Sequence, residues 1–449
     1  MRLKKTFNSQ KTFFYLLIIV FNYIIQLLLI SDAYSQSEVY LSVRAGGSGL
    51  ITIGLGGFES SDQSSIINSV KTTLEDDLFT SGLFQVRTLP DSAADSSGSL
   101  FELWKDAGAK YYLLGEEENK NNTVTINLID LKTALTVLKE EYRIDSKRPW
   151  HTAHVIVDDM IEFFTGLRGS MVSQIAFVRT VKGSEEIFLI DADGRNLHQL
   201  TFSKTLLMSP DWSPDGNSIA YSAINRNNWL IMMININTGQ SIDISQWSGL
   251  NTTPAWSPIT PGVIAFTSSR DGNAEIYTCR IDGKDIRRLT NHGRIDSSPS
   301  WSPDGSKIAF TSDRTGNPLI YIMNSDGSDP HRLTSTPNAY EDSPCWSPRG
   351  DRIAFVMMSD YGFDIVTTSP TGEDVVVLTF AQGSNEDPQW SPDGLRILFT
   401  STRTTGTKRL FIMNRDGSNV RPLTIDGNNF SPAWGPSVSA NDIRISSKR

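Results

Sequence analysis

Five histidines are the first side chains to test for chemistry, because imidazole serves metal binding, proton transfer and nucleophilic catalysis. They are His151, His154, His198, His292 and His331. His151 and His154 stand three residues apart at the start of a predicted helix, but no Glu, Cys or third His extends them into a metal-ligand set. The sequence also contains no Gly-x-Ser-x-Gly nucleophile motif. These residues therefore favour a binding protein over an enzyme.

Two cysteines and one acidic turn are the other groups that suggest a cross-link or a metal site. Cys279 and Cys345 lie 66 residues apart, which is about one and a half periods of the repeat described below. That spacing places them on non-adjacent units, so we interpret them as small buried hydrophobic residues. The turn Asp191-Ala192-Asp193-Gly194 lacks the acidic residue that completes a twelve-residue calcium loop. We expect neither a metal nor a cofactor.

A repeat must position all of these groups. Its signature is a tryptophan followed by a Ser-Pro-Asp-Gly type of turn, with successive tryptophans 44 or 45 residues apart. The tryptophans are Trp212, Trp256, Trp301, Trp346, Trp390 and Trp434. A proline stands two residues before each one, and a short apolar run of the Ile-Ala-Phe type follows all but the last. Four short strands per unit, separated by turn residues, indicate a meandering four-stranded sheet.

Such sheets bury both faces only against neighbours of their own kind, which favours the blades of a propeller. A linear solenoid is the alternative, but no capping repeat is visible. The run Ile175-Ala176-Phe177 has no tryptophan strand before it, and Trp434 has no such run after it. Pairing these two orphans closes a six-bladed propeller over residues 174–438. We interpret one tryptophan per unit as packing between blades.

Residues 36–165 have no repeat and predict a separate α/β domain of ordinary size. Apolar periodicity predicts helices near residues 66–78, 100–105 and 157–164, and strands near 84–86, 111–114, 124–129 and 136–142. The glycine-rich stretch 46–57 matches no phosphate-binding loop, and we interpret it as a flexible, strand-breaking loop. Residues 166–173 form the expected linker to the propeller, and residues 439–449 a polar tail.

Residues 1–35 are typical of a Sec-type secretory signal. Basic residues precede an apolar run from Thr12 to Ile30, and Ala33 and Ser35 occupy positions −3 and −1 of a cleavage site after Ser35. An uncleaved membrane anchor is the alternative, because the run is nearly long enough to span a bilayer. We expect a soluble mature protein outside the cytoplasm, beginning near Gln36.

The formal net charge is −9, and it becomes −12 without residues 1–35, which carry four cations and one anion. Such acidity excludes nucleic acid as a partner and favours basic or neutral proteins. Acidic residues precede three consecutive tryptophan strands: Asp296, Glu341-Asp342 and Glu386-Asp387. Because every blade enters the ring in the same direction, we interpret these acids as a rim at one mouth that attracts basic groups. The alternative is that acids simply suit turns and solubility.

The repeat, the preceding α/β region and the junction between them resemble the TolB family. The junction is similar to the family's H-x-x-x-D, L/F-T-G-x-x-G and I-A-Y/F-V motifs, here carried by His154 to Asp158, Phe164 to Gly169 and Ile175 to Val178. Residues 207–214 are similar to the family's first propeller turn. The resemblance covers essentially the whole mature chain. It implies a periplasmic propeller protein of the Gram-negative Tol–Pal system.

The resemblance also implies partners and sites. It implies binding of the peptidoglycan-associated lipoprotein Pal at the propeller mouth and of TolA through the N-terminal segment, in support of outer-membrane invagination during cell division and of envelope integrity. By position, the TolA-binding residues are Glu38, Val39, Tyr40, Leu41, Ser42 and Val43. The Pal-binding residues are Leu250, Thr253, Asp296 and Ser297, with Glu341, Asp342, Glu386 and Asp387 beside them. We expect a monomer that associates peripherally with the outer membrane and peptidoglycan through Pal.

Some residues depart from the family pattern. Leu250 stands where relatives often have a histidine, the turn after Trp256 lacks Asp-Gly, and Ile244-Ser245 replaces a closing Leu-Thr. Two other functions stay open from the sequence. One is a periplasmic hydrolase or lyase that uses the propeller channel, and the other is a cell-wall carbohydrate-binding module.

Overall fold

The computed structural model describes residues 49–58, 66–87, 89, 100–118, 122–226, 228–245, 247–336, 339–404, 406–437 and 444–446. All of them belong to one compact unit, Ser48–Arg449. The predicted signal 1–35 and the predicted TolA-binding segment 38–43 lie outside the described residues. Within the described ranges, no helix is both long and apolar enough to span a bilayer.

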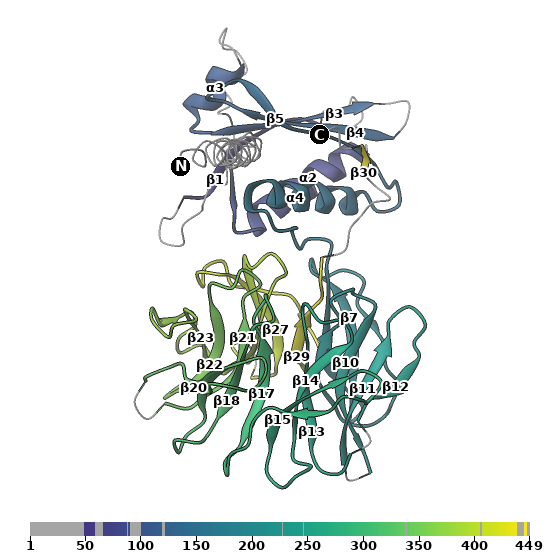
Figure 1. Ribbon diagram of the computed structural model, residues 1–449. Helices are drawn as coiled ribbons and strands as arrows, with labels where there is room; N and C mark the ends of the chain where they lie inside the picture. The colour runs from purple at the N-terminus through teal and green to yellow at the C-terminus, as the bar shows by residue number, and fades with distance from the viewer. Residues whose placement is uncertain are drawn as a thin grey trace, which may run out of the picture. The chain divides into compact units, whose positions relative to one another are not determined.

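The first region is a mixed sheet with helices on its faces (Figure 1). Its strand order is β2-β1-β3-β4-β5-β30, in which β1 pairs in parallel with β2 and β3 and the remaining pairs are antiparallel. Its strands are β1 (Ile51–Gly57), β2 (Phe84–Arg87), β3 (Tyr111–Glu118), β4 (Thr123–Asp130), β5 (Leu135–Arg143) and β30 (Arg444–Ser446). Its helices are α2 (Ile66–Thr80), α3 (Leu100–Asp106) and α4 (Pro149–Thr165). Each helix and strand predicted for residues 66–165 is present.

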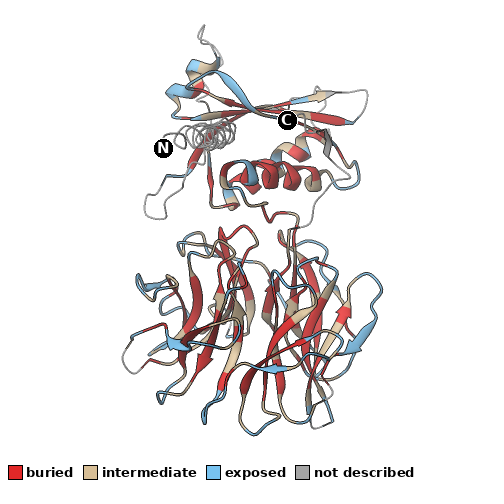
Figure 2. Ribbon diagram, viewed as in Figure 1, coloured by how far each residue is buried: buried red, intermediate tan, exposed pale blue. Residues whose placement is uncertain are grey.

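Helices α2 and α4 share one apolar core with the sheet. Val70 and Leu74 of α2 and Ile161 of α4 lie in the same buried cluster as Ile53 and Leu113 of the strands. Every residue of α4 from Thr152 to Ile161 is buried, so most of its ribbon is red in Figure 2. A helix buried around its whole circumference must have neighbours on all sides. One of those neighbours is the propeller, as the site below shows.

The prediction for the glycine-rich stretch was wrong over its described part, because residues 51–57 form strand β1, which pairs with β2 on one side and β3 on the other. A Cβ on Gly54 would lie 2.5 Å from Cε3 of Trp104, and a Cβ on Gly56 would lie 2.1 Å from Oη of Tyr112. These two rings are neighbours, with centroids 5.7 Å apart, in a second apolar cluster on the other face of the sheet. The glycines therefore mark a close approach of large side chains and not a flexible loop.

Six four-stranded blades follow, and they close into a ring among the described residues, which confirms the predicted propeller. We number the blades I to VI by their inner strands. These are β9 (Leu207–Trp212), β13 (Asn251–Trp256), β17 (Asp296–Trp301), β21 (Glu341–Trp346), β25 (Asn385–Trp390) and β29 (Asn429–Trp434). In blade VI, β29 pairs with β6 (Gln174–Val181), and Trp434 lies opposite Ile175. The predicted pairing of the two orphan strands is confirmed.

The other strands of the blades are short and run back and forth in chain order. They are β7 (Ser184–Asp191), β8 (His198–Gln199), β10 (Ser218–Asn225), β11 (Asn228–Asn235), β12 (Ser241–Asp243), β14 (Val263–Ser268), β15 (Glu275–Arg280), β16 (Arg287–Arg288), β18 (Lys307–Ser312), β19 (Leu319–Asn324), β20 (His331–Arg332), β22 (Ile353–Ser359), β23 (Gly362–Thr368), β24 (Val376–Val377), β26 (Arg396–Ser401), β27 (Arg409–Asn414) and β28 (Arg421–Pro422).

The tryptophans of the repeat join one blade to the blade before it. The indole N–H of Trp256 donates to the carbonyl oxygen of Asp211 at 3.1 Å, and that of Trp301 donates to the carbonyl oxygen of Ala255 at 3.1 Å. At the closure, the indole of Trp212 donates to the carbonyl oxygen of Ala433 at 3.2 Å. The predicted role in packing between blades is confirmed, and it explains why one tryptophan is needed per repeat.

Both cysteines are free thiols, as predicted. Cys279 is buried between strands, whereas Cys345 is only half-buried and lines the channel at the centre of the ring. Burial raises the pKa of each thiol to about 12. Both thiols therefore stay protonated at neutral pH.

The C-terminal residues do more than form a polar tail. Residues Arg444–Ser446 form β30, which pairs antiparallel with β5 at the edge of the first sheet. The chain thus returns to its first folded region after the propeller closes.

Candidate functional site

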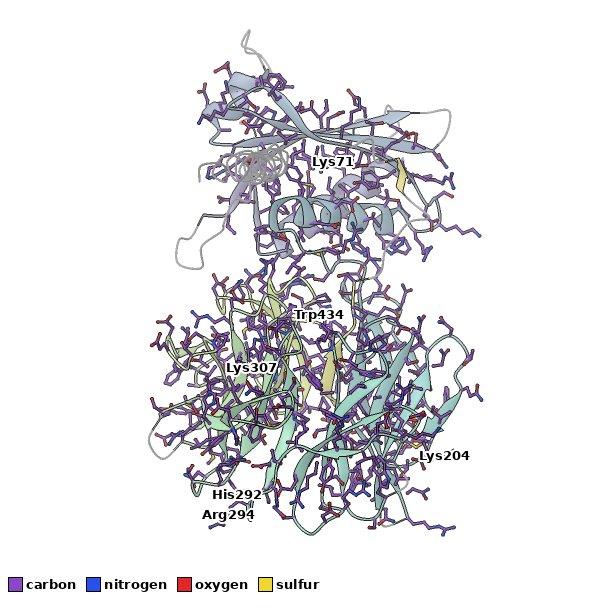
Figure 3. All side chains as sticks on the ribbon, in the orientation of Figure 1. Lys71, Lys204, His292, Arg294, Lys307 and Trp434 are labelled. Carbon is purple, nitrogen blue, oxygen red and sulfur yellow. The ribbon has the colours of Figure 1, made fainter. Side chains whose placement is uncertain are left out.

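The six inner strands surround a channel with a cavity of about 460 Å³. We call the end where the inner strands begin the mouth, and the end with the Trp-Ser-Pro turns the turn end. In Figure 3, His292 and Arg294, on the loop that leads into β17, lie at the mouth, and Trp434 lies toward the turn end. The candidate site residues predicted from Leu250 to Asp387 all belong to the mouth or to the channel just inside it.

The third residue of every inner strand faces the channel. Its backbone has a positive φ, and a proline follows it. The six residues are Ser209, Thr253, Ser298, Ser343, Asp387 and Ser431, and all of them line the cavity. The strand register shifts at this position in each blade, as in a β-bulge. The repeat therefore builds a ring of five hydroxyl groups and one carboxylate.

Two carboxyl groups of the channel are protonated more readily than usual. Burial raises the pKa of Asp387, and the neighbouring Glu386 adds to the rise. Burial raises the pKa of Asp211, one residue before Trp212, to about 7, although backbone N–H groups of Trp212 and Trp256 oppose the rise. The channel wall is thus less negative than its acidic residues imply.

The predicted acidic rim is wrong at two of its positions. Asp296 and Glu341 are the first residues of their inner strands, and both are 0% exposed. Asp296 accepts a hydrogen bond from Nη2 of Arg314 at 2.9 Å, and Glu341 accepts hydrogen bonds from the backbone N–H of Ile320 and from Thr334. Burial raises the pKa of both carboxyl groups. These acids hold the loops of the mouth in place and do not present charge at its surface.

The same position in the other blades shows why. Asn251, Asn385 and Asn429 begin their inner strands and are equally buried. Asn385, for example, accepts hydrogen bonds from Ser401 at 2.8 Å and Arg403 at 2.9 Å. In five blades a polar side chain at this position pairs buried loop groups, whether or not it is charged, whereas blade I has the buried Leu207 there.

Two predicted acids do remain half-exposed at the mouth. Asp342 accepts a hydrogen bond from the hydroxyl group of Thr311 at 2.8 Å. Glu386 pairs with Nζ of Lys408 at 2.7 Å, and this bond, together with one from Ser384, lowers the pKa of Glu386 although burial alone would raise it. Charge at the mouth is therefore weaker than predicted.

The mouth is instead more apolar than predicted. The residue just before the inner strand is apolar in blades I to IV, where it is Leu206, Leu250, Ile295 or Tyr340. Leu206 and Ile295 are exposed, whereas Leu250 and Tyr340 are half-buried. Ser297, the second residue of β17, is also half-buried. Sequence reasoning selected Leu250 alone, although the same register in four repeats carries the signal.

The turn end is held to the α/β region by a buried histidine. In His154 of α4, Nδ1 lies 2.6 Å from Oδ2 of Asp77 in α2, and Nε2 lies 3.0 Å from Oδ2 of Asp193 in blade VI. Its side chain is 6% exposed. Burial alone would lower the pKa of His154, but the hydrogen bonds and charges of the two aspartates raise it to about 10. A protonated imidazole therefore bridges the α/β region and the propeller.

A second set of buried groups completes this joint. The carboxylate of Asp158 accepts hydrogen bonds from the backbone N–H of Met171 at 2.7 Å and of Val172 at 3.1 Å. The hydroxyl group of Ser170 donates to Asp393 at 2.5 Å and accepts from Nη2 of Arg396 at 2.6 Å. The junction motif from His154 to Asp158 thus works as a structural connection.

The described residues hold no group of three or more His, Cys, Asp or Glu side chains that could hold a metal ion. His151 lines a second cavity of about 280 Å³ near the joint, together with Trp150, Gln174 and Trp212. Its neighbour His154 is committed to the two aspartates, so the pair does not act as a unit.

The family model for the TolB beta propeller domain matches residues 161–438, which is more than half of the chain. The chain belongs to the TolB family. A TolB homolog of Chlorobium luteolum is 33% identical over 415 residues, which cover 90% of this chain and 94% of the relative. A TolB homolog of Chlorobium chlorochromatii is 33% identical over 278 residues, which cover 60% of this chain and only 62% of the relative.

Solved structures agree with this assignment. The crystal structure of TolB from Acinetobacter baumannii is similar with a TM-score of 0.74 and 26% identity, over 87% of this chain and 97% of that one. A nidogen/laminin complex matches with a TM-score of 0.50 at 13% identity, which reflects the propeller fold alone. The chain is therefore a TolB-type propeller protein with an N-terminal α/β region.

Proposed function

We propose that this chain is a periplasmic adaptor of the Tol–Pal system that acts by binding. It takes Pal at the propeller mouth and TolA through residues 38–43, in support of outer-membrane invagination during division and of envelope integrity. Membership of the TolB family supports this proposal. The sequence also predicts a secretory signal and completes none of the catalytic or metal-binding motifs considered above. The observation that carries it is the mouth itself, where six blades present half-exposed apolar and acidic groups around one opening.

The Pal-binding set is divided by its burial. Leu250, Ser297, Asp342 and Glu386 are half-buried at the mouth and available for contact. Thr253 and Asp387 line the channel below them. Asp296 and Glu341 contribute by holding the loops. Such a surface combines apolar and polar groups, as protein interfaces do.

Affinity for Pal without its lipid tests the mouth. The mature chain with both Asp342→Asn and Glu386→Gln should bind Pal about tenfold more weakly, a loss of about 1.4 kcal/mol, because two half-exposed carboxylates lose their charge. The matched control is Asp285→Asn with Asp329→Asn, two exposed acids on turn-end loops whose positive φ asparagine tolerates. If the two double variants bind Pal with equal affinity, the mouth is not the Pal-binding site. If the wild type does not bind Pal, the proposal as a whole is rejected.

The TolA contact is tested by deletion. A chain lacking Gln36 to Val43 should lose TolA binding completely and keep its affinity for Pal, because the proposal places the two contacts on different segments. Capture of each partner on beads, with the intact mature chain as the control, measures both effects. Loss of both partners would contradict separate sites.

A channel enzyme is the second candidate function. Asp211 and Asp387 line the same cavity, and burial raises the pKa of both, that of Asp211 to about 7. A carboxyl group with such a pKa suits proton transfer near neutral pH. Turnover of a panel of peptidoglycan fragments by the wild type, and its loss in Asp211→Asn, would favour this function over the adaptor.

A further inference from the structure

Blade IV exposes three large apolar side chains at the mouth. Met358 is 55% exposed, Tyr361 61% and Phe380 66%. The rings of Tyr361 and Phe380 meet edge to face with centroids 5.7 Å apart. Met358 lies opposite Phe363 in the β22–β23 hairpin, and Phe363 lies 5.7 Å from the ring of Tyr340. We call Met358, Tyr361 and Phe380 the blade IV patch.

At the corresponding end of the hairpin, other blades carry an arginine that lies over buried rings of the blade core. Arg314 lies over the rings of Phe310 and Tyr321, at 5.4 and 4.9 Å, in blade III. Arg403 lies over Phe399 and Phe411, at 5.0 and 4.9 Å, in blade V. Arg270 does the same for Tyr277 in blade II. Stacking of a guanidinium group on these rings keeps their faces from water.

Strand register locates the equivalent position in blade IV. The arginine has a fixed place relative to the inner strand. In blade III, Asp296 begins the inner strand and pairs with Ser312, and Arg314 follows two residues after Ser312. In blade IV, Glu341 pairs with Met357, so the equivalent residue is Ser359. The strands β22 and β23 are also one residue longer than their counterparts in blades II, III and V. Blade IV therefore has a serine in place of this arginine, longer paired strands and a shorter connection between them.

The patch lies beside the half-exposed acids of the mouth. The backbone N–H of Met358 donates to the carbonyl oxygen of Tyr340, the residue before the inner strand, at 2.9 Å. The exposed Asp360 stands within the hairpin, and Asp342 is half-exposed on the same blade. The β22–β23 segment contains no Lys or Arg. The charged side chains of this segment, Asp360 and Asp364, are therefore both acidic.

We propose that the blade IV patch is the apolar anchor of the mouth, and that it takes up an apolar side chain that basic residues flank in the bound protein. Exposed clusters of large apolar groups mark interaction sites, and aromatic anchors dominate binding energy at interfaces. The acids around the patch select the basic flanks. The inference rests on the proposed function in one respect, because it takes the lipoprotein as the bound protein.

The experiment measures the affinity of the mature chain for Pal without its lipid. Tyr361→Ser with Phe380→Ser should weaken binding at least tenfold, and the affinity of the wild type should fall as salt rises. The matched control is Phe79→Ser with Ile259→Ser, which removes two equally exposed apolar residues, 65% and 59%, outside the mouth. This control should bind within twofold of the wild type.

A third variant keeps the test independent of misfolding. Met358→Lys replaces an exposed apolar side chain of the patch with a cation, so it should weaken binding while the melting temperature stays unchanged. Wild-type affinity in this variant and in Tyr361→Ser with Phe380→Ser would overturn the anchor but leave the proposed function standing. An affinity that does not respond to salt would overturn the basic flanks. Absence of Pal binding by the wild type would reject the proposed function and the anchor together.

Discussion

The same six strands form both ends of the channel, yet the two ends differ in the contacts that their charged and apolar groups make. At the turn end, charged groups are buried and paired, as in His154 between Asp77 and Asp193. At the mouth, large apolar groups and single carboxylates stay exposed or half-exposed, as in Tyr361 and Asp342. Buried charges with partners suit a permanent joint, because separating them would leave a charge out of water. Exposed apolar groups suit a contact that forms and dissociates reversibly.

The comparison assigns stability to one end and partner binding to the other. Substitutions at the turn end should lower the free energy of unfolding and leave Pal affinity unchanged in the folded fraction. Substitutions of exposed residues at the mouth should lower Pal affinity and leave the free energy of unfolding unchanged.

The largest expected effect is at the histidine of the joint. His154→Ala should lower the free energy of unfolding by about 3–5 kcal/mol, because Asp77 would remain buried without its partner. Urea unfolding of the mature chain measures the loss. The control His198→Ala removes an exposed histidine and should change stability by no more than about 0.5 kcal/mol. Similar values for the two variants would contradict the division between the ends.

The pH dependence of the same joint sharpens the comparison. The pKa of His154 rises from 6.5 to about 10 on folding, so the folded protein binds this proton more tightly than the unfolded chain. The stability that His154 contributes is therefore full below about pH 6.5, declines as pH rises, and is lost as pH passes about 10. The difference in unfolding free energy between wild type and His154→Gln should shrink across this window. A difference that grows with pH would refute the protonated bridge.

A smaller effect is expected at the second set of joint residues. Ser170→Ala should cost about 1–3 kcal/mol, because Asp393 and Arg396 each lose a buried hydrogen-bond partner. Ser297→Ala, at the mouth, should change stability by no more than about 0.5 kcal/mol. Thermal unfolding of both variants measures the contrast. If Ser297→Ala lowers the stability more than Ser170→Ala does, the division of roles between the two ends is wrong.

The smallest expected effect separates two tryptophans of the repeat. The indole of Trp390 donates to the carbonyl oxygen of Cys345 at 3.2 Å, whereas the buried indole nitrogen of Trp346 has no hydrogen-bond partner among the described residues. Trp390→Phe should therefore cost about 1 kcal/mol more than Trp346→Phe, since both lose the same volume and one also loses a hydrogen bond. Urea unfolding of the pair measures this difference, and equal costs would show that packing alone joins the blades.

The fold was predictable because its signal is periodic. Recurring tryptophans and apolar runs specify blades, and two unmatched strands specify how the ring closes. Helices such as Ile66–Thr80 follow from apolar spacing in the same way. The role of the glycines in β1 was not predictable, because Trp104 lies 50 residues beyond Gly54 in the sequence and reaches it only across the sheet.

The candidate site was predictable only in its location. The sequence placed Asp296 and Glu341 at the mouth, but their burial depends on loops that fold over them, with Arg314 as the partner of Asp296. The asparagines at the equivalent positions of other blades were the available signal that a charge was not required there. The blade IV patch was missed because Tyr361 and Phe380 lie 19 residues apart in the sequence and meet only in the folded blade.

The amino-acid sequence by itself determined the six blades, their closure and the order of the α/β elements, because these depend on local periodicity that repeats along the chain. Only the tertiary structure decided which charges are used within the fold and which face outward. His154 meets Asp77, 77 residues before it, and Asp193, 39 residues after it. The cost of removing a charge from water depends on what surrounds it in space, and no spacing along the chain records those surroundings.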